Sequence, residues 1–349
     1  MNIEQQVWGM MEDGRPVILY TMTNSNGAYV KLINYGAAIV AVGVPDKNGV
    51  IGDVALGYKD WQSYMNDGPG MGKSVGRYAN RIAKGKFTLD GKDYQLAINN
   101  PPNHLHGGPG GFANRLWESR VEVNRVVFSY ISADGEEGYP GELGVEAVFD
   151  WDDDCFLEIT YLAKCDAPTV VNLTNHVYFN LKGDGSGDIL DHYLQLNSEK
   201  YLPTDDTQIP TGELAPVAVT PMDFKAPHTL GERINDPFEA LKIGSGYDHC
   251  WAIYGYEQGK MSIAGKLSEP TSGRSVTVTT TQPGIQVYTG NWLADAPMGK
   301  SGKYEARSGV AMECQLYPDS PNQPSFPTAV LRPGEMYEQH IAYSFSVEK

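Results

Sequence analysis

Dipeptides that favour tight hairpin turns recur along the 349 residues of this chain. They are Asp13-Gly14, Asn26-Gly27, Asn48-Gly49, Asp90-Gly91 and Asp134-Gly135. Asn-Gly and Asp-Gly suit two-residue hairpin turns, because such turns need a positive φ. Runs rich in β-branched and other apolar residues lie between and beyond these turns, at 17–23, 28–32, 38–44, 126–131, 144–151, 193–196, 276–281, 310–316 and 339–347. The pattern predicts many short strands in antiparallel order.

Helical periodicity is weak throughout, and only residues 60–65 and 237–241 favour short helices. We therefore expect an all-β protein with two or more large antiparallel sheets. The length alone suggests about two domains, but no change of composition marks a linker. We expect residues 1–349 to form a single domain.

The composition disfavours a nucleic-acid partner, and the cysteine spacing disfavours a zinc site or a disulfide framework. Hydrophobic residues make up 41% of the chain, enough for an extensive core, and the formal net charge is −16. Because phosphate binding needs clustered lysine and arginine, this charge disfavours a nucleic-acid partner. The four cysteines are Cys155, Cys165, Cys250 and Cys314, and their spacing predicts neither a zinc site nor a disulfide framework.

The N-terminal sequence M-N-I-E-Q-Q-V-W-G has neither the basic nor the apolar region of a secretion signal. The most apolar run, residues 37–44, is far too short to span a bilayer. We expect a cytoplasmic protein with no membrane partner. A periplasmic location is the alternative, if an export signal was removed ahead of Met1.

The stretch P-T-V-V-N-L-T-N-H-V-Y-F-N-L, residues 168–181, begins as an apolar strand and continues with several polar side chains. Residues two apart share one face of a strand, so we expect His176, Tyr178 and Asn180 on the same face. The opposite face would carry Asn175, Val177 and Phe179. A histidine with polar and aromatic neighbours suits a site for a small polar molecule. A histidine that is simply buried in a large sheet is the alternative.

Two patterns resemble ligand sites without meeting their requirements. Residues 68–74, G-P-G-M-G-K-S, fall one residue short of a phosphate-binding loop and lie outside a strand–loop–helix unit. His104 and His106 lie two apart and can share a strand face as metal ligands. A third ligand from Asp248 or His249 has no support in the spacing. We expect neither a nucleotide nor a metal.

Two arginines and a pair of histidines are candidates for ligand contacts. Arg77 and Arg81 lie in G-R-Y-A-N-R-I, and the guanidinium fork suits paired sugar hydroxyls as well as carboxylates. An ion pair within the chain is the alternative. In N-H-L-H-G-G, the glycines that follow His106 let the backbone approach a ligand closely, or form an ordinary turn.

Three later segments carry further candidates. Asp248 stands beside aromatic residues in G-Y-D-H-C-W, a composition common at carbohydrate sites, although a turn position is the alternative. Gln286 and Tyr288 share a face of the strand expected in Q-P-G-I-Q-V-Y-T-G-N. Glu313 interrupts the apolar run V-A-M-E-C-Q-L. Burial there would raise its pKa toward the range of a general base, whereas an outward-facing glutamate is the alternative.

Together these segments resemble the aldose 1-epimerase, or galactose mutarotase, family. The matching pieces are G-R-Y-A-N-R-I-A-K-G-K-F, N-H-L-H-G-G, N-L-T-N-H-V-Y-F-N-L, Y-D-H, Q-P-G-I-Q-V-Y-T-G-N, M-E-C-Q, N-Q-P-S-F-P and L-R-P-G-E. They run in family order from about residue 70 to the C-terminus. The resemblance implies a large β-sandwich of the galactose mutarotase supersandwich type, with the sugar in an open cleft on one sheet.

The resemblance also implies residue roles. His176 stands where the family has its general acid, and Glu313 where it has its general base. The positions expected to hold the sugar are Arg81, His106, Asp248 and Gln286, with Asn80 and Tyr178 beside them. The implied reaction interconverts the α and β anomers of free aldoses such as galactose and glucose, without a cofactor. We expect a monomer or a homodimer.

Two other functions are compatible with such a fold. A hexose-phosphate mutarotase should carry extra basic residues at the cleft. A non-catalytic carbohydrate-binding protein would keep aromatic and arginine contacts, but would not need both His176 and Glu313.

Overall fold

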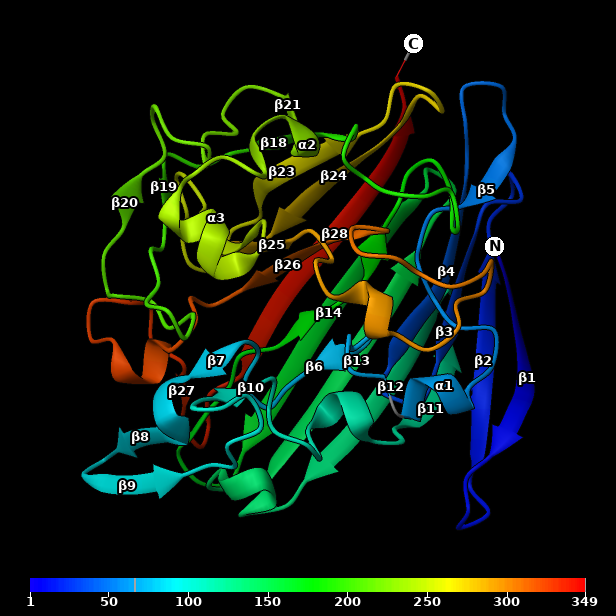
Figure 1. Ribbon diagram of the computed structural model, residues 1–349. Coiled ribbons are helices and arrows are strands. Elements are labelled where there is room, and N and C mark those ends of the chain that lie inside the picture. Colours follow the sequence, from blue (N-terminus) through cyan, green and yellow to red (C-terminus); the bar gives the residue numbers. More distant parts are fainter. Residues whose placement is uncertain (66, 349) are drawn as a thin grey trace.

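The largest element of the computed structural model, which describes residues 1–65 and 67–348, is an antiparallel sheet of nine strands. Figure 1 shows its long strands running side by side across the molecule. In spatial order they are β11 (Glu118–Glu122), β12 (Arg125–Ser132), β13 (Leu143–Trp151), β14 (Phe156–Cys165), β28 (Tyr337–Val347), β24 (Arg274–Thr280), β23 (Ser262–Ser268), β18 (Tyr193–Leu196) and β21 (His228–Thr229).

Two smaller antiparallel sheets accompany it. The six-stranded sheet has the order β17 (Tyr178–Phe179), β26 (Val310–Gln315), β25 (Gly284–Tyr288), β22 (Asp248–Ala252), β19 (Lys200–Tyr201) and β20 (Ala215–Pro216). The five-stranded sheet has the order β1 (Asn2–Met10), β2 (Pro16–Thr23), β3 (Tyr29–Ile33), β4 (Ala38–Pro45) and β5 (Ile51–Asp53).

Short elements connect these sheets. The two-stranded pairs are β6 (Ser74–Val75) with β16 (Thr174–Asn175), β7 (Arg81–Ile82) with β10 (His104–Leu105), β8 (Lys86–Leu89) with β9 (Lys92–Gln95), and β15 (Thr169–Val170) with β27 (Val330–Leu331). The α-helices are α1 (Gln62–Met65), α2 (Leu230–Arg233) and α3 (Glu239–Gly244). Single 3₁₀ turns cover Ala83–Gly85, Phe112–Asn114, Glu136–Gly138, Leu293–Asp295 and Ser320–Asn322.

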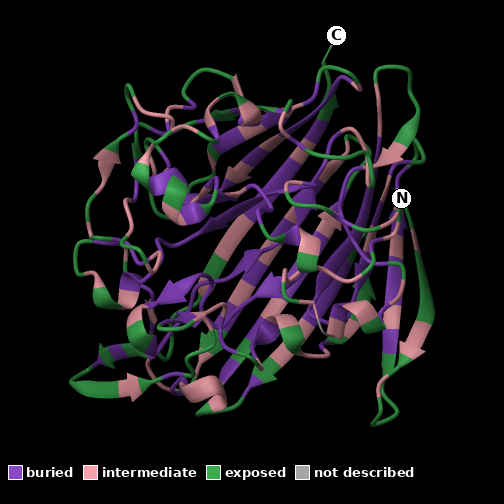
Figure 2. Ribbon diagram, viewed as in Figure 1, coloured by how far each residue is buried: buried purple, intermediate pink, exposed green. Residues whose placement is uncertain are grey.

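The core lies between the large sheet and the two smaller ones. One cluster of buried residues joins Val30 of β3, Ile159 of β14 and Val287 of β25. Burial alternates along β14, where every second residue packs inward, as expected for a strand with one face on a core. Figure 2 shows buried residues along the middles of the long central strands, and exposed ones in many loops and along the edge strand β1. A core shared in this way is what a single domain requires, and the single domain stays a prediction.

The expected fold class is confirmed. All nine strand-forming runs lie largely within strands, and the two expected helices correspond to α1 and α3. The glycines of the five turn dipeptides all have a positive φ, between 77° and 84°. The longest strands that were missed are β1, at the edge of the five-stranded sheet, and β14, in the middle of the large sheet.

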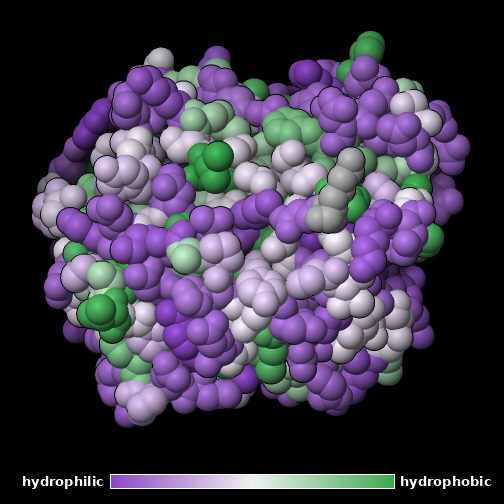
Figure 3. Space-filling model, turned by 90° about the horizontal axis from the view of Figure 1, so that it is seen from above, coloured by the Kyte–Doolittle hydropathy of each residue, from purple (hydrophilic) through white to green (hydrophobic). Residues whose placement is uncertain are grey.

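The described residues contain no helix that is long and apolar enough to cross a membrane. The face in Figure 3 is mostly hydrophilic, and its apolar side chains lie in small separate groups.

Candidate active site

A cavity of about 600 Å³ opens beside the six-stranded sheet. Its walls come from the strands of that sheet and from loops that include residues 67–70, 99–109 and 292–295. It brings together every predicted site residue except Gln286, namely Asn80, Arg81, His106, His176, Tyr178, Asp248 and Glu313. These residues are spread over more than 230 positions of sequence, from 80 to 313.

Strand alternation places Glu313 in the cavity. Its neighbours on β26, Met312 and Cys314, pack in the hydrophobic core. Because successive side chains of a strand point to opposite faces, Glu313 must point away from that core. It is nevertheless only 2% exposed, because the walls of the cavity enclose it. Glu313 is therefore buried in the wall of the cavity, and the alternative of an outward-facing, exposed glutamate is excluded.

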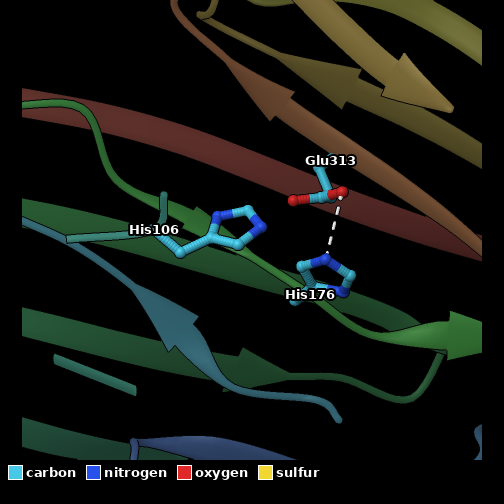
Figure 4. Close-up of side chains that lie close together, drawn as sticks. All are labelled: His106, His176 and Glu313. Carbon is cyan, nitrogen blue, oxygen red and sulfur yellow. Dashed lines mark ion pairs between the residues drawn. The ribbon is translucent and has the colours of Figure 1, made fainter. Parts of the chain in front are cut away.

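His176 lies directly against Glu313. The distance from His176 Nε2 to Glu313 Oε1 is 3.4 Å (Figure 4). The other carboxylate oxygen, Oε2, is buried and has no hydrogen-bond partner among the described residues. Native structures rarely leave buried polar atoms unpaired, so a bound molecule is the natural partner for this oxygen.

Burial shifts the pKa of both groups toward their neutral forms. Burial raises the pKa of the Glu313 carboxyl well above its usual range, and the nearby Asp248 raises it further, against the opposing effect of Arg81. Burial lowers the pKa of His176 to about 4. Two groups whose environment shifts their pKa values in opposite directions are typical of an acid–base pair.

His106 presents a hydrogen-bond donor to this pair. Its Nδ1 accepts a hydrogen bond of 3.1 Å from the Asn80 backbone N–H. Burial, reinforced by the charges of His176 and Arg81, lowers its pKa well below the usual value, so the ring is neutral. The proton of the neutral ring is then on Nε2. The ring nitrogen farther from the backbone points toward His176 and Glu313 in Figure 4.

The three residues can also be compared with a metal site. Ligand atoms of His106, His176 and Glu313 all lie within 4.8 Å of one another. A metal-binding imidazole needs a free lone pair at the ligating nitrogen. His106 carries its proton there, because Asn80 occupies the lone pair of Nδ1. The arrangement therefore favours donation to a hydroxyl group over coordination of a metal.

A chain of hydrogen bonds joins the remaining polar side chains. Arg81 NH2 donates to Gln208 Oε1 at 2.5 Å, and Gln208 Nε2 donates to Asp248 Oδ2 at 2.8 Å. Gln286 Nε2 donates to Asp248 Oδ1 at 2.7 Å. Gln286 thus reaches the site through Asp248 and does not itself line the cavity. Arg81 Nε also donates to Asn100 Oδ1 at 3.1 Å.

Aromatic rings form one wall of the cavity. The Tyr178 ring lies 5.0 Å from the His176 ring, and the Tyr288 ring lies 6.5 Å from it, centroid to centroid. The Tyr178 hydroxyl donates to the Pro69 carbonyl, which fixes the ring at the wall. Aromatic faces beside polar donors suit the apolar face of a sugar ring.

The prediction of one continuous strand in residues 168–181 is wrong. The chain forms three two-residue pieces instead, β15, β16 and β17, which pair with different partners. His176 and Tyr178 do reach the same cavity, and Val177 and Phe179 pack in the core. Asn180 does not join them.

Asn180 fails to reach the site because its amide is used within the fold. Its Nδ2 donates to the backbone carbonyls of Gly187 and Ser308, each at 3.0 Å. A buried asparagine satisfied by two carbonyls in this way holds loops together.

His104 does not share a face with His106. The φ of His106 is +52°, which turns its side chain away from the line of β10. His104 is fully buried, and its two ring nitrogens contact the Ala97 carbonyl and the Tyr139 hydroxyl, each at 2.7 Å. His249 is similarly engaged with the Ala240 carbonyl at 3.0 Å. The pairing of His104 with His106 as metal ligands, which the sequence left as an alternative, does not fit this arrangement.

Residues 68–74 line part of the cavity, but their lysine is already engaged. Lys73 forms a buried ion pair with Asp67, and its Nζ also donates to the Tyr64 carbonyl and to Asn114 Oδ1. It is therefore not free to bind a phosphate. This supports the prediction that the segment holds no nucleotide.

Sequence reasoning missed Gln208 altogether. It lies in the loop between β19 and β20, within the polar run T-D-D-T-Q, which reads as an ordinary turn. Its distance of 127 positions from Arg81 leaves no local signal. Tyr288 was placed on the same face as Gln286, but was not recognised as part of the wall.

Comparison with known proteins identifies the family of the chain. The family model described as aldose 1-epimerase matches residues 19–344. Galactose mutarotase of Homo sapiens is 43% identical over 347 residues, which cover 99% of both chains. Aldose 1-epimerase of Escherichia coli strain K12 is 37% identical over 339 residues, which cover 96% of this chain and 97% of that one.

Solved structures show the same fold. A crystal structure of an aldose epimerase homologue from C. elegans has a TM-score of 0.88 at 33% identity, covering 95% of this chain and 100% of that one. A galactose 1-epimerase structure from Lactobacillus acidophilus has a TM-score of 0.86 at 26% identity, covering 100% of both chains. The resemblance found in the sequence is confirmed, and the chain belongs to the aldose 1-epimerase family.

Proposed function

We propose that this enzyme interconverts the α and β anomers of free aldoses such as galactose and glucose, with His176 as the acid and Glu313 as the base. The observation that carries the proposal is the buried contact of 3.4 Å between His176 and Glu313 at the wall of the cavity. The neutral sugar is a small-molecule substrate of the kind that the family acts on. We further propose a cytoplasmic monomer or homodimer that has no nucleic-acid or membrane partner.

The reaction needs two proton transfers in each direction. His176 donates a proton to the ring oxygen while Glu313 accepts the proton of the anomeric hydroxyl, and the hemiacetal opens to an aldehyde. Rotation about the C1–C2 bond turns the other face of the carbonyl toward the ring hydroxyl. On closure the residues exchange roles. Glu313 returns a proton to the carbonyl oxygen, and His176 takes the proton of the attacking hydroxyl.

The other polar groups have a positioning task. Arg81 and the Nε2–H of His106 donate hydrogen bonds to sugar hydroxyls, whereas Asp248 accepts them. They hold the rest of the sugar while the anomeric carbon moves, which is the source of much of the rate gain in such sites. Since ring opening and closure involve no change of oxidation state, the mechanism uses no cofactor.

The anomeric relaxation of freshly dissolved α-galactose and α-glucose tests the proposal. Polarimetry or NMR should show faster relaxation with a trace of the protein than without it. The variants Glu313→Gln and His176→Asn should each lower kcat by about 10²–10⁴-fold, the range for one general acid or base. Galactose binding should weaken much less, because Arg81, His106 and Asp248 remain.

Two outcomes would contradict the proposal. A folded Glu313→Gln protein that relaxes α-galactose at the wild-type rate refutes the base assignment. A wild-type protein that binds galactose without accelerating its relaxation is a carbohydrate-binding protein. The double variant is the internal control. It should lose less than the product of the two single losses, because the two residues act in one proton transfer.

A further inference from the structure

Gln208 joins the two charged side chains that hold the sugar in the proposed function. Its amide oxygen accepts from Arg81 NH2 at 2.5 Å, and its amide nitrogen donates to Asp248 Oδ2 at 2.8 Å. Gln208 also lines the same cavity as Arg81 and Asp248. Only a group that both donates and accepts can bridge a guanidinium and a carboxylate in this way, and an amide is neutral as well.

The loop that carries Gln208 is held rigidly from two sides. Asp205 Oδ1 accepts hydrogen bonds from the Thr207 N–H at 2.8 Å and from the Ile209 N–H at 3.1 Å. From outside the loop, Asn103 Nδ2 donates to the Thr207 carbonyl at 3.1 Å. Asn103 belongs to the segment that also carries His106, so the loop is fixed to another wall of the site.

The backbone at Gln208 is in an unfavourable conformation for its residue type. Its φ is +63°, in a region of backbone conformation that residues other than glycine and asparagine rarely adopt. Two other residues of the cavity wall share this feature, Asn80 with φ +64° and His106 with φ +52°. Non-glycine residues in this region persist where the surrounding structure requires their side chains, and functional sites are such places.

The bridge determines how Asp248 is presented. One of its oxygens accepts from Gln286 and the other from Gln208, so the carboxylate is held at both ends. Without Gln208 the carboxylate could rotate, and Arg81 would lose one of its two side-chain partners, leaving Asn100. The separation of Arg81 and Asp248 would then no longer be fixed. Because both must contact the same sugar, the sugar would be held less firmly in the reactive orientation.

We infer that Gln208 is a positioning residue of the active site, whose amide fixes Arg81 and Asp248 relative to each other so that both engage the sugar hydroxyls. The inference rests on the proposed function. It adds Gln208, whose loop lies outside all the motifs by which the sequence resembles the family.

Three variants separate the positioning role from a general structural one. Gln208→Met keeps the length of the side chain and removes both hydrogen bonds. Gln208→Glu keeps the shape but cannot donate to Asp248 unless it is protonated. Gln6→Glu, on the exposed strand β1, is the matched control for the added charge. Each is assayed for kcat and KM with α-galactose, from pH 5 to pH 9, together with thermal unfolding.

Gln208→Met should raise KM by about tenfold while kcat changes by about twofold or less, because lost hydrogen bonds to charged groups typically cost that much in affinity. Gln208→Glu should show a KM that rises with pH. At low pH one proton shared between the two carboxylates restores the donor, and at high pH the carboxylates repel each other. The Gln6→Glu variant should match the wild type throughout.

A binding measurement removes any effect on the chemical step. In the Glu313→Gln background, titration calorimetry with galactose should show Kd weakened by about tenfold when Gln208→Met is added. An unchanged KM and Kd in folded Gln208→Met and Gln208→Glu proteins would overturn the inference. The inference would also be overturned if both variants lost the same activity at every pH and this loss only followed a lower unfolding temperature. An inactive wild type would instead count against the proposed function.

Discussion

At the scale of single residues, the proposed mechanism depends on how many protons the His176–Glu313 pair carries. Burial disfavours both His176⁺ and Glu313⁻, so a single proton on the pair lies mainly on Glu313 when the site is empty. The reactive arrangement places that same proton on His176. The two arrangements differ only in which residue carries the single proton. A pH titration therefore reports pKa values of the pair as a whole, and not of His176 or Glu313 alone.

This coupling predicts the pH dependence of kcat/KM. Activity should fall at acid pH as His176 takes up the second proton, with a pKa of about 4. It should fall again at alkaline pH as the pair loses its last proton, around the raised pKa of Glu313. Polarimetry at a series of pH values, corrected for the spontaneous relaxation of the sugar at each pH, measures the acid and the alkaline limb of the profile.

The opposite assignment gives a different curve. If each residue titrated at its ordinary pKa, the acid limb would lie near 4.5 for Glu313 and the alkaline limb near 6.5 for His176. An alkaline fall centred near 6.5 would therefore contradict the shared-proton account.

At the scale of elements, the segment that ends in β7 contains two arginines with unlike environments. Arg77 is 1% exposed, and its guanidinium donates to the backbone carbonyls of Pro140, Gly141 and Ser132 at 2.8–3.1 Å. Arg81 instead lines the cavity. Arg77 thus ties this segment to the β12–β13 connection, whereas Arg81 faces the cavity.

Lysine at each position should have different effects. Arg77→Lys keeps the charge but loses the fork that reaches several carbonyls, so the free energy of unfolding should drop by about 2–4 kcal/mol. Arg81→Lys should leave the unfolding free energy nearly unchanged. It should instead raise the activation free energy derived from kcat/KM by about 1–3 kcal/mol.

Urea unfolding and initial-rate kinetics on the same preparations make this comparison. The two substitutions are identical in chemistry and lie four residues apart, so each serves as the control for the other. Kinetics unchanged in Arg81→Lys, or stability unchanged in Arg77→Lys, would reverse the corresponding assignment.

The same segment shows how far the sequence predicts the structure. Hairpin turns depend on local backbone preferences, so dipeptides such as Asn26-Gly27 were enough to locate them. The motif containing Arg77 and Arg81 indicated a candidate segment, but not which of the two arginines lines the cavity. Burial against carbonyls more than 50 positions away decides that, and no local signal reports it.

β14 and Gln208 were missed for different reasons. β14 carries a local signal, since the buried residues Leu157, Ile159, Tyr161 and Ala163 alternate with less buried ones along F-L-E-I-T-Y-L-A-K-C, and this alternation was overlooked. Gln208 becomes part of the site only because its loop packs beside Asn103. The resemblance supplied the other site residues, since it summarises long-range contacts that composition and spacing do not contain.

At the scale of the whole molecule, we expect the negative charge of the chain to disfavour anionic substrates. The formal net charge of the chain is −16. The carboxylates that line the cavity are Asp67, Asp248 and Asp295, beside the protonated Glu313, whereas the lysine and arginine in its lining are Lys73 and Arg81. Both cations already have partners, namely Asp67 for Lys73 and Gln208 with Asn100 for Arg81.

Free glucose should therefore be a better substrate than glucose 6-phosphate. A phosphate near −2 in charge would enter a cavity with an excess of carboxylates and no free cation among the residues lining it. We expect kcat/KM to be lower by about tenfold or more for the phosphate, equivalent to roughly 1.4 kcal/mol. The difference in kcat/KM between the two sugars should decrease as salt is added, because screening at 0.15 M acts over about 8 Å.

The uncharged 6-O-methylglucose controls for size. It should be relaxed more efficiently than the phosphate, and its efficiency should not depend on salt. A preference for glucose 6-phosphate over both sugars at equal concentration would identify a hexose-phosphate mutarotase instead.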